Sequence, residues 1–153
     1  MLTCADSRVV PELIFDQGLG DLFCVRVAGN IVDDAILGSV EYAVVHLGVK
    51  LVVVLGHEGC GAVAAAIAGD ETELHIDELV RAIRPAVERA RARGGDLEQH
   101  TVLENALQSA RLLRESEDVL AGQIQDHGLL IVPAVYSLHT GAVELIEPER
   151  GAL

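Results

Sequence analysis

The order of apolar and polar residues predicts a strand followed by a helix in the first third of the chain. Leu22 to Val27 is apolar enough for a strand, and it leads into the loop Ala28-Gly29-Asn30. Six apolar residues then recur at the three- and four-residue spacing of a helix: Ile36, Leu37, Val40, Ala43, Val44 and Leu47. We expect this helix to begin at Asp33 and Asp34, because acidic side chains favour the positive end of a helix, and to run to about His46.

The segment Leu51 to Leu55 (LVVVL) gives the clearest strand signal in the chain. It is apolar throughout, which is typical of a central strand of a parallel sheet with both faces covered. The tight loop Gly56-His57-Glu58-Gly59-Cys60-Gly61 follows, and then a helix from about Ala62 to Ala68. A strand, a tight loop and a helix in this order place functional side chains at the carboxyl end of a sheet.

The second half of the chain is predicted to be mainly helical and to return to the sheet near its end. After a polar loop at Gly69 to Glu73, we expect two or three helices between about residues 75 and 124, interrupted at Pro85 and at Gly94-Gly95. Leu129 to Val135 is predicted to form a strand. A turn at Thr140-Gly141 then lets residues 142–146 pair back as an edge strand.

Together these elements predict an α/β fold: a single domain, residues 1–153, with a central, mostly parallel β-sheet flanked by helices and a C-terminal edge strand. The chain has two Phe, two Tyr and no Trp, so its core must be aliphatic. The formal net charge of -13 repels phosphate backbones and anionic lipids, which argues against nucleic acid and membrane surfaces as partners. We expect a cytoplasmic protein, because neither a signal peptide nor an apolar stretch of membrane-spanning length is recognisable.

Two short motifs bring metal-binding residue types to the predicted carboxyl edge of the sheet. Cys4-Ala5-Asp6-Ser7-Arg8 ends an expected strand, and His57-x-x-Cys60 ends the LVVVL strand. Zn²⁺ prefers thiolate and imidazole ligands, and catalytic zinc sites keep one position open. Cys4, His57 and Cys60 therefore form a candidate three-ligand set for Zn²⁺. The glycines around His57 and Cys60 would let the backbone fold tightly around such an ion.

These residue types also occur in sites that bind no metal. A lone His-x-x-Cys pair is a weak signal, and a lone buried cysteine is usually a small apolar core residue; we assign that role to Cys24, which lies between Phe23 and Val25. The glycine spacing fits neither a phosphate loop nor a dinucleotide turn. Four further histidines are expected to be exposed or to lie at helix ends, where any of them could shuttle protons: His46, His75, His100 and His127.

The CADSR and GHEGCG motifs resemble those of the β-class carbonic anhydrases, and the likeness continues in Phe15 to Phe23, in residues 27–30 and 39–43, and in residues 136–141. The resemblance implies zinc bound by Cys4, His57 and Cys60. It also implies two roles for Asp6. Asp6 either pairs with Arg8 and accepts a hydrogen bond from water on the zinc, or leaves Arg8 and takes the fourth zinc position itself.

The resemblance further implies the reversible hydration of carbon dioxide to bicarbonate and a proton. Phe23 and Tyr42 match the apolar substrate pocket, which in the family reaches across a dimer interface, so a homodimer or a higher even oligomer is expected. The helices and the glutamine that relatives carry upstream of CADSR are not seen here, and low activity is one expected consequence. The alternatives left open are a carbon disulfide or carbonyl sulfide hydrolase, and a non-catalytic zinc- or bicarbonate-binding homologue.

Overall fold

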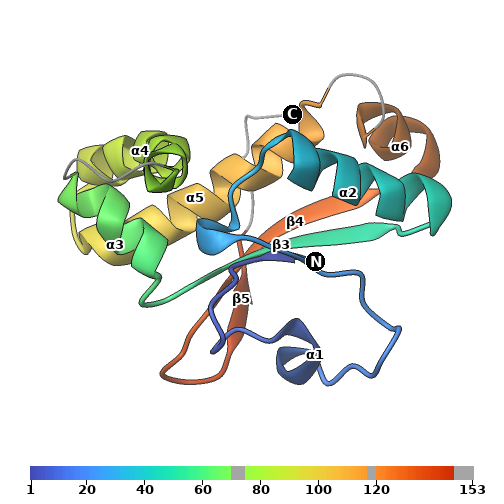
Figure 1. Ribbon diagram of the computed structural model, residues 1–153, viewed down its shortest axis with the longest axis horizontal. Helices are drawn as coiled ribbons and strands as arrows, with labels where there is room; N and C mark the ends of the chain where they lie inside the picture. Colours follow the sequence, from blue (N-terminus) through green and yellow to red (C-terminus); the bar gives the residue numbers. More distant parts are fainter. Residues whose placement is uncertain (70–74, 117–119, 147–153) are drawn as a thin grey trace.

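The computed structural model describes residues 1–69, 75–116 and 120–146, which form a five-stranded sheet flanked by helices (Figure 1). The spatial order of the strands is β2-β1-β3-β4-β5. Strands β1 to β4 run parallel, and β5 pairs antiparallel with β4 at the edge. The predicted fold class is confirmed. The strands are β1 (Leu2–Thr3), β2 (Val25–Arg26), β3 (Leu51–His57), β4 (Leu130–Tyr136) and β5 (Val143–Leu145).

Helices cover both faces of the sheet. Figure 1 shows α2, α5 and α6 over one face and the short helix α1 on the other. On the first face, aliphatic side chains of these three helices pack against β1, β3 and β4. The helical elements are α1 (Pro11–Ile14), the 3₁₀ turn η1 (Ala28–Asn30), α2 (Asp34–His46), α3 (Gly61–Ala68), α4 (Ile76–Arg93), α5 (Leu97–Arg114) and α6 (Leu120–His127).

Strand β3 is the centre of the sheet, as the LVVVL run predicts. It continues two residues further than predicted, through Gly56 to His57, because β4 pairs with it along its whole length up to His57 and Tyr136. A Cβ atom at Gly56 would lie 3.1 Å from Val102 Cγ1 and 3.6 Å from Ala106 Cβ of α5. The glycine therefore lets α5 pack closely against the strand just before His57.

The ends of the helices follow the sequence signals at several points. Asp33 caps α2, since its carboxylate accepts a hydrogen bond from the Ile36 N–H at 2.8 Å. The predicted break at Gly94-Gly95 is confirmed, because Gly94 ends α4 with a positive φ of 75°. Asp96 then caps α5 by accepting from the Gln99 N–H at 3.0 Å.

The predicted interruption at Pro85 is wrong, because α4 runs without a break from Ile76 to Arg93. A proline in a helix interior removes one backbone hydrogen bond and is unfavourable by about 3 kcal/mol. In this helix the neighbouring side chains of Ile83, Ala86 and Val87 are fully or almost fully buried. Burial of this apolar face outweighs the local penalty, an effect of tertiary packing that propensity alone does not reveal.

The other strand predictions hold in position but not always in length. Only Val25 and Arg26 of the predicted strand Leu22 to Val27 enter the ladder, since β1 offers just Leu2 and Thr3 as partners. Strands β4 and β5 confirm the predicted strand at 129–135 and the edge strand at 142–146. Of the predicted loop at Gly69 to Glu73, all residues after Gly69 lie outside the described residues.

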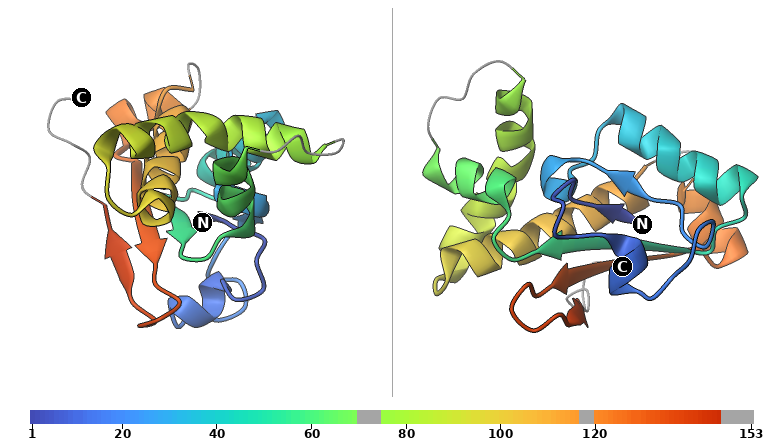
Figure 2. Two further views of the ribbon diagram at one scale, coloured as in Figure 1. Left: turned by 90° about the vertical axis from the view of Figure 1, so that its left-hand side faces the viewer. Right: turned by 60° about the horizontal axis from the view of Figure 1, so that its bottom comes forward.

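The edge of the sheet formed by the carboxyl ends of β1 and β3 faces helices α3 and α4 (Figure 2). Here a cluster of buried apolar side chains joins these helices to the 3₁₀ turn, and it includes Cys4, Cys60, Val63 and Ile83. Among the described residues, no helix is both long enough and apolar enough to cross a membrane.

Candidate metal centre

Three buried side chains meet at this edge of the sheet. Cys4 directly follows β1, His57 is the last residue of β3, and Cys60 precedes the first residue of α3. Because β1 and β3 are parallel neighbours with Thr3 opposite Leu55, their carboxyl ends bring Cys4 and His57 together. One potential ligand atom from each of Cys4, His57 and Cys60 lies within 4.8 Å of the other two. All three residues are at most 5% exposed.

The distances and orientations fit a metal ion. In a tetrahedral zinc site with Zn–S bonds of 2.3 Å, the two sulfurs stand about 3.8 Å apart, and Cys4 Sγ and Cys60 Sγ are 4.0 Å apart. His57 Nδ1 lies 2.8 Å from the Glu58 carbonyl oxygen. The buried Nε2 has no hydrogen-bond partner in the described part of the chain. A buried ring nitrogen without a partner is costly unless it binds something else.

The two thiols also disturb each other's ionisation. The hydrogen bond between the two sulfurs lowers the pKa of the Cys4 thiol, and the same interaction raises the pKa of the Cys60 thiol well above its usual range. Two thiolates this close together repel each other, so the pair resists losing both protons without a cation. A divalent cation allows both thiols to ionise, since each thiolate then faces a positive charge rather than only another sulfur.

Neighbouring backbone groups support each sulfur. The Gly29 N–H donates to Cys4 Sγ at 3.4 Å. Cys60 sits at the N-terminus of α3, where the helix dipole favours a thiolate. Gly59 adopts a positive φ of 62°, a backbone conformation that favours glycine and that turns the loop from His57 to Cys60.

Asp6 and Arg8 form a bidentate ion pair beside the cluster. Arg8 Nε donates to Asp6 Oδ1 at 3.0 Å, and Arg8 Nη2 donates to Asp6 Oδ2 at 2.6 Å. Arg8 Nη2 also donates to the Gly59 carbonyl at 2.9 Å, which ties the pair to the His57–Cys60 loop. The Arg8 guanidinium, together with the Arg8 backbone N–H, holds the pKa of Asp6 well below its usual range. This pairing matches the first of the two arrangements that the resemblance implies.

Two residues near the cluster were not predicted from the sequence. Arg26 donates to the carbonyl oxygens of Cys4, Asp6 and Val9 at 3.1, 2.7 and 2.9 Å. The Glu58 carboxylate accepts hydrogen bonds from the Ser137 hydroxyl and the His139 N–H, at 2.9 and 3.3 Å. The sequence signal for Arg26 was its position as a lone arginine between Val25 and Val27; its exposed side chain folds back onto the segment that follows β1.

Phe23 and Tyr42, the predicted substrate-pocket residues, lie near each other but away from the cluster of Cys4, His57 and Cys60. Their ring centroids are 6.3 Å apart, and Tyr42 is 53% exposed. The Phe23 carbonyl accepts from the Met1 ammonium, at the amino end of β1. Since a strand rises about 3.3 Å per residue, this carbonyl lies roughly 10 Å along the strand from Cys4. Within one chain, the structure does not bring these rings to the three-residue cluster.

The sequence analysis also predicted the location of Cys24 and of four histidines. The assignment of Cys24 to the core is wrong in part, because the residue is only partly buried and its thiol donates to Glu12 at 3.5 Å. His46 and His127 end α2 and α6 and are exposed, and His75 precedes α4 and is exposed too. His100 is partly buried in the first turn of α5, where its Nδ1 lies 2.6 Å from the Gly94 carbonyl.

Comparison with known proteins identifies the family. A family model described as carbonic anhydrase matches residues 1–143. Carbonic anhydrase 2 of Mycobacterium tuberculosis is 44% identical over 151 residues, covering 93% of this chain and 70% of that protein. The carbonic anhydrase of Mycolicibacterium smegmatis is 39% identical over 146 residues, covering 93% of this chain and 71% of that protein.

Among solved structures, the Coccomyxa β-carbonic anhydrase in complex with acetazolamide superposes with a TM-score of 0.85 at 28% identity. The match covers 95% of this chain and 69% of that one. The parallel sheet, the cluster at its carboxyl edge and the matches over most of the chain agree with one another. The chain therefore belongs to the β-carbonic anhydrase family.

Proposed function

We propose that this chain catalyses the reversible hydration of carbon dioxide to bicarbonate and a proton, with a zinc ion held by Cys4 Sγ, Cys60 Sγ and His57 Nε2. One observation carries the proposal. Three buried donor atoms of zinc-preferring types lie within 4.8 Å of one another, and the buried His57 Nε2 has no other partner among the described residues.

The donor set also indicates what the ion would contribute. When bound, Zn²⁺ lowers the pKa of adjacent water and so supplies hydroxide as a nucleophile near neutral pH. Cys4 and Cys60 offset the formal charge of the ion, so the ion would acidify water less than it would with three neutral imidazole ligands. His57 contributes a neutral ligand, and its ring is oriented by the contact between Nδ1 and the Glu58 carbonyl.

Asp6 is the residue we assign to orienting the attacking water. Its carboxylate remains ionised because Arg8 donates two side-chain hydrogen bonds to it and the Arg8 backbone N–H donates a third, at 2.8 Å. An ionised carboxylate is a hydrogen-bond acceptor only. Asp6 can therefore accept a hydrogen bond from water and so would orient that water for attack on carbon dioxide.

The alternative role of Asp6, as a fourth metal ligand, requires a different arrangement. The hydrogen bonds that Asp6 receives from Arg8, two of which form the bidentate charge-assisted pair, would have to rearrange. The pairing of Asp6 with Arg8 therefore supports the arrangement in which Asp6 does not bind the zinc ion and water can take the fourth coordination position. Arg8 then acts as the residue that holds Asp6 away from the metal.

We also propose a homodimer, or a larger even oligomer, in which Phe23 and Tyr42 of one subunit serve the pocket of its partner. Tyr42 is about half exposed and Leu47 is 53% exposed at the end of α2. A cavity of about 340 Å³ beside Phe23 has mainly apolar walls. Exposed aromatic and aliphatic groups on one surface are typical of a protein interface.

Replacing one proposed ligand tests the metal site directly. In Cys60→Ser, a weakly ligating hydroxyl replaces a thiolate, so zinc content measured by elemental analysis should fall from about one ion per chain to a small fraction after dialysis against a chelator. Carbon dioxide hydration, followed by stopped flow, should fall with it. Cys24→Ser is the matched control and should keep both.

Zinc retained in full by Cys60→Ser would contradict the ligand assignment. Native protein that is full of zinc but shows no hydration above buffer would contradict the proposed reaction. Carbon disulfide and carbonyl sulfide should be assayed on the same preparation, because faster hydrolysis of either would favour the alternative substrate class.

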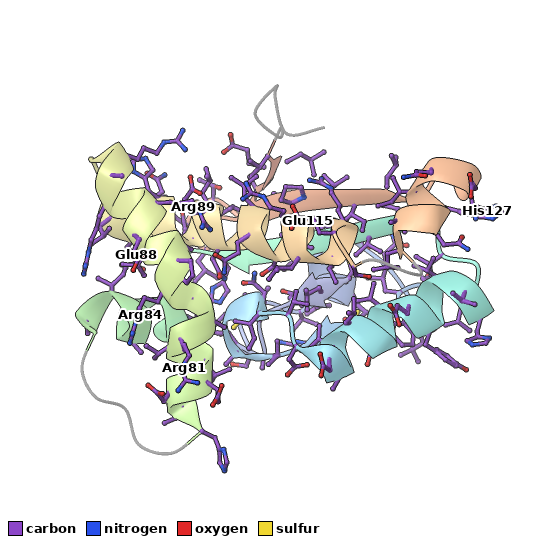
Figure 3. The ribbon with its side chains drawn as sticks, turned by 90° about the horizontal axis from the view of Figure 1, so that it is seen from above. Arg81, Arg84, Glu88, Arg89, Glu115 and His127 are labelled. Carbon is purple, nitrogen blue, oxygen red and sulfur yellow. The ribbon has the colours of Figure 1, made fainter. Side chains whose placement is uncertain are left out.

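The ion pair predicts a loss of turnover without loss of metal. In Arg8→Ala, Asp6 loses the guanidinium that holds it, so kcat should fall on the order of tenfold or more while zinc content stays unchanged. Arg84→Ala is a suitable control, since Arg84 is exposed on α4 (Figure 3). Unchanged kcat, or loss of zinc in the Arg8 variant, would show that Arg8 has another role.

The oligomer is tested by light scattering after size-exclusion chromatography. The native chain should elute with twice the mass of one chain or a higher even multiple. Tyr42→Asp places a charge on the proposed interface and should shift the protein toward monomer, with reduced hydration. Leu112→Asp, at a 45% exposed residue of α5, should not. A native monomer at working concentration would contradict the proposal.

A further inference from the structure

Two buried polar side chains of helix α5 contact the 3₁₀ turn η1, which lies beside the cluster of Cys4, His57 and Cys60. Asn105 Nδ2 donates to the Gly29 carbonyl at 2.7 Å, and Ser109 Oγ donates to the Asn30 carbonyl at 2.9 Å. Both side chains belong to residues that are 1% exposed. They lie four residues apart, on one face of the helix, and reach residues 76 and 79 positions away in the sequence.

The turn held by these bonds touches one of the proposed ligands. The Gly29 N–H donates to Cys4 Sγ at 3.4 Å. Gly29 adopts a positive φ of 71°, and a Cβ atom there would lie 2.7 Å from Ile83 Cδ1 and 3.1 Å from Ala62 Cβ. Gly29 is therefore held between α3 and α4, and Asn105 fixes its carbonyl from α5.

We propose that Asn105 is a positioning residue of the metal site, which holds Gly29 so that its N–H donates to the Cys4 thiolate. The inference rests on the proposed function, because it assumes that Cys4 is a metal ligand. An N–H donor withdraws electron density from a thiolate. Cys4 then neutralises less of the charge on a bound metal, which partly offsets the weaker acidification expected from two thiolate ligands.

Ser109 provides a matched control for this role. It comes from the same helix, is equally buried, and donates a similar hydrogen bond to the next residue of the same turn. The Asn30 N–H, however, donates to the Val27 carbonyl at 3.0 Å and not to the sulfur. Removal of either side chain should destabilise the turn, but only removal of the Asn105 side chain should alter the hydrogen bond to Cys4.

The proposal is tested with the protein loaded with ¹¹³Cd²⁺ alone and studied by NMR. The native protein should show scalar coupling between the Gly29 amide proton and ¹¹³Cd, transmitted through the N–H···S bond. In Asn105→Ala this coupling should be lost, the ¹¹³Cd resonance should shift, and removal of the metal by a chelator should be about tenfold faster. Ser109→Ala should keep the coupling and change the removal rate less than about twofold.

Several outcomes would overturn the proposal. Asn105→Ala could keep the coupling and the native removal rate, or Ser109→Ala could reproduce all the effects of Asn105→Ala. If Asn105→Ala does not fold, the native measurement can still refute the role, since cadmium bound by Cys4, His57 and Cys60 without coupling to Gly29 would exclude it while leaving the proposed function intact. Failure to bind cadmium at these residues would refute both.

Discussion

The pairing of β1 with β3 is the constraint on which the rest of the site depends. Leu2 and Thr3 lie opposite Val54 and Leu55, so that Cys4 emerges from the sheet next to Gly56 and His57. Side chains alternate between the faces of a strand, and a slip of one residue would turn Cys4 to the other face. The short β1 strand avoids such a slip because it is hydrogen-bonded between β2 and β3, and because Arg26 holds the segment that follows it.

The cluster is supported from several directions, and each proposed ligand has its own contact. The Gly29 N–H donates to Cys4 Sγ, and the Glu58 carbonyl oxygen contacts the ring of His57. Cys60 lies at the N-terminus of α3, whose dipole favours a thiolate. Two thiolates 4.0 Å apart in a buried site would repel each other unless a cation lies between them. The fold therefore holds the two sulfurs at a distance at which both can ionise only beside a cation.

Local patterns predict the parts of the fold and site that depend on neighbouring residues. The apolar LVVVL run identifies the central strand, and the glycines around His57 and Cys60 identify the loop that follows it. Such patterns fail where contacts between distant residues decide. Pro85 is tolerated because α4 buries an apolar face, and Asn105 acts on a turn 76 residues earlier in the chain. Likewise, Glu58 meets Ser137 only because β3 and β4 end side by side.

X-ray absorption spectroscopy of the zinc-loaded protein tests the proposed ligand set, because it reports the atoms bound to the ion. We expect two sulfur neighbours at about 2.3 Å and nitrogen or oxygen neighbours at about 2.0–2.1 Å, in a four-coordinate site. A spectrum that requires only nitrogen and oxygen ligands, or a single sulfur, would contradict this ligand set.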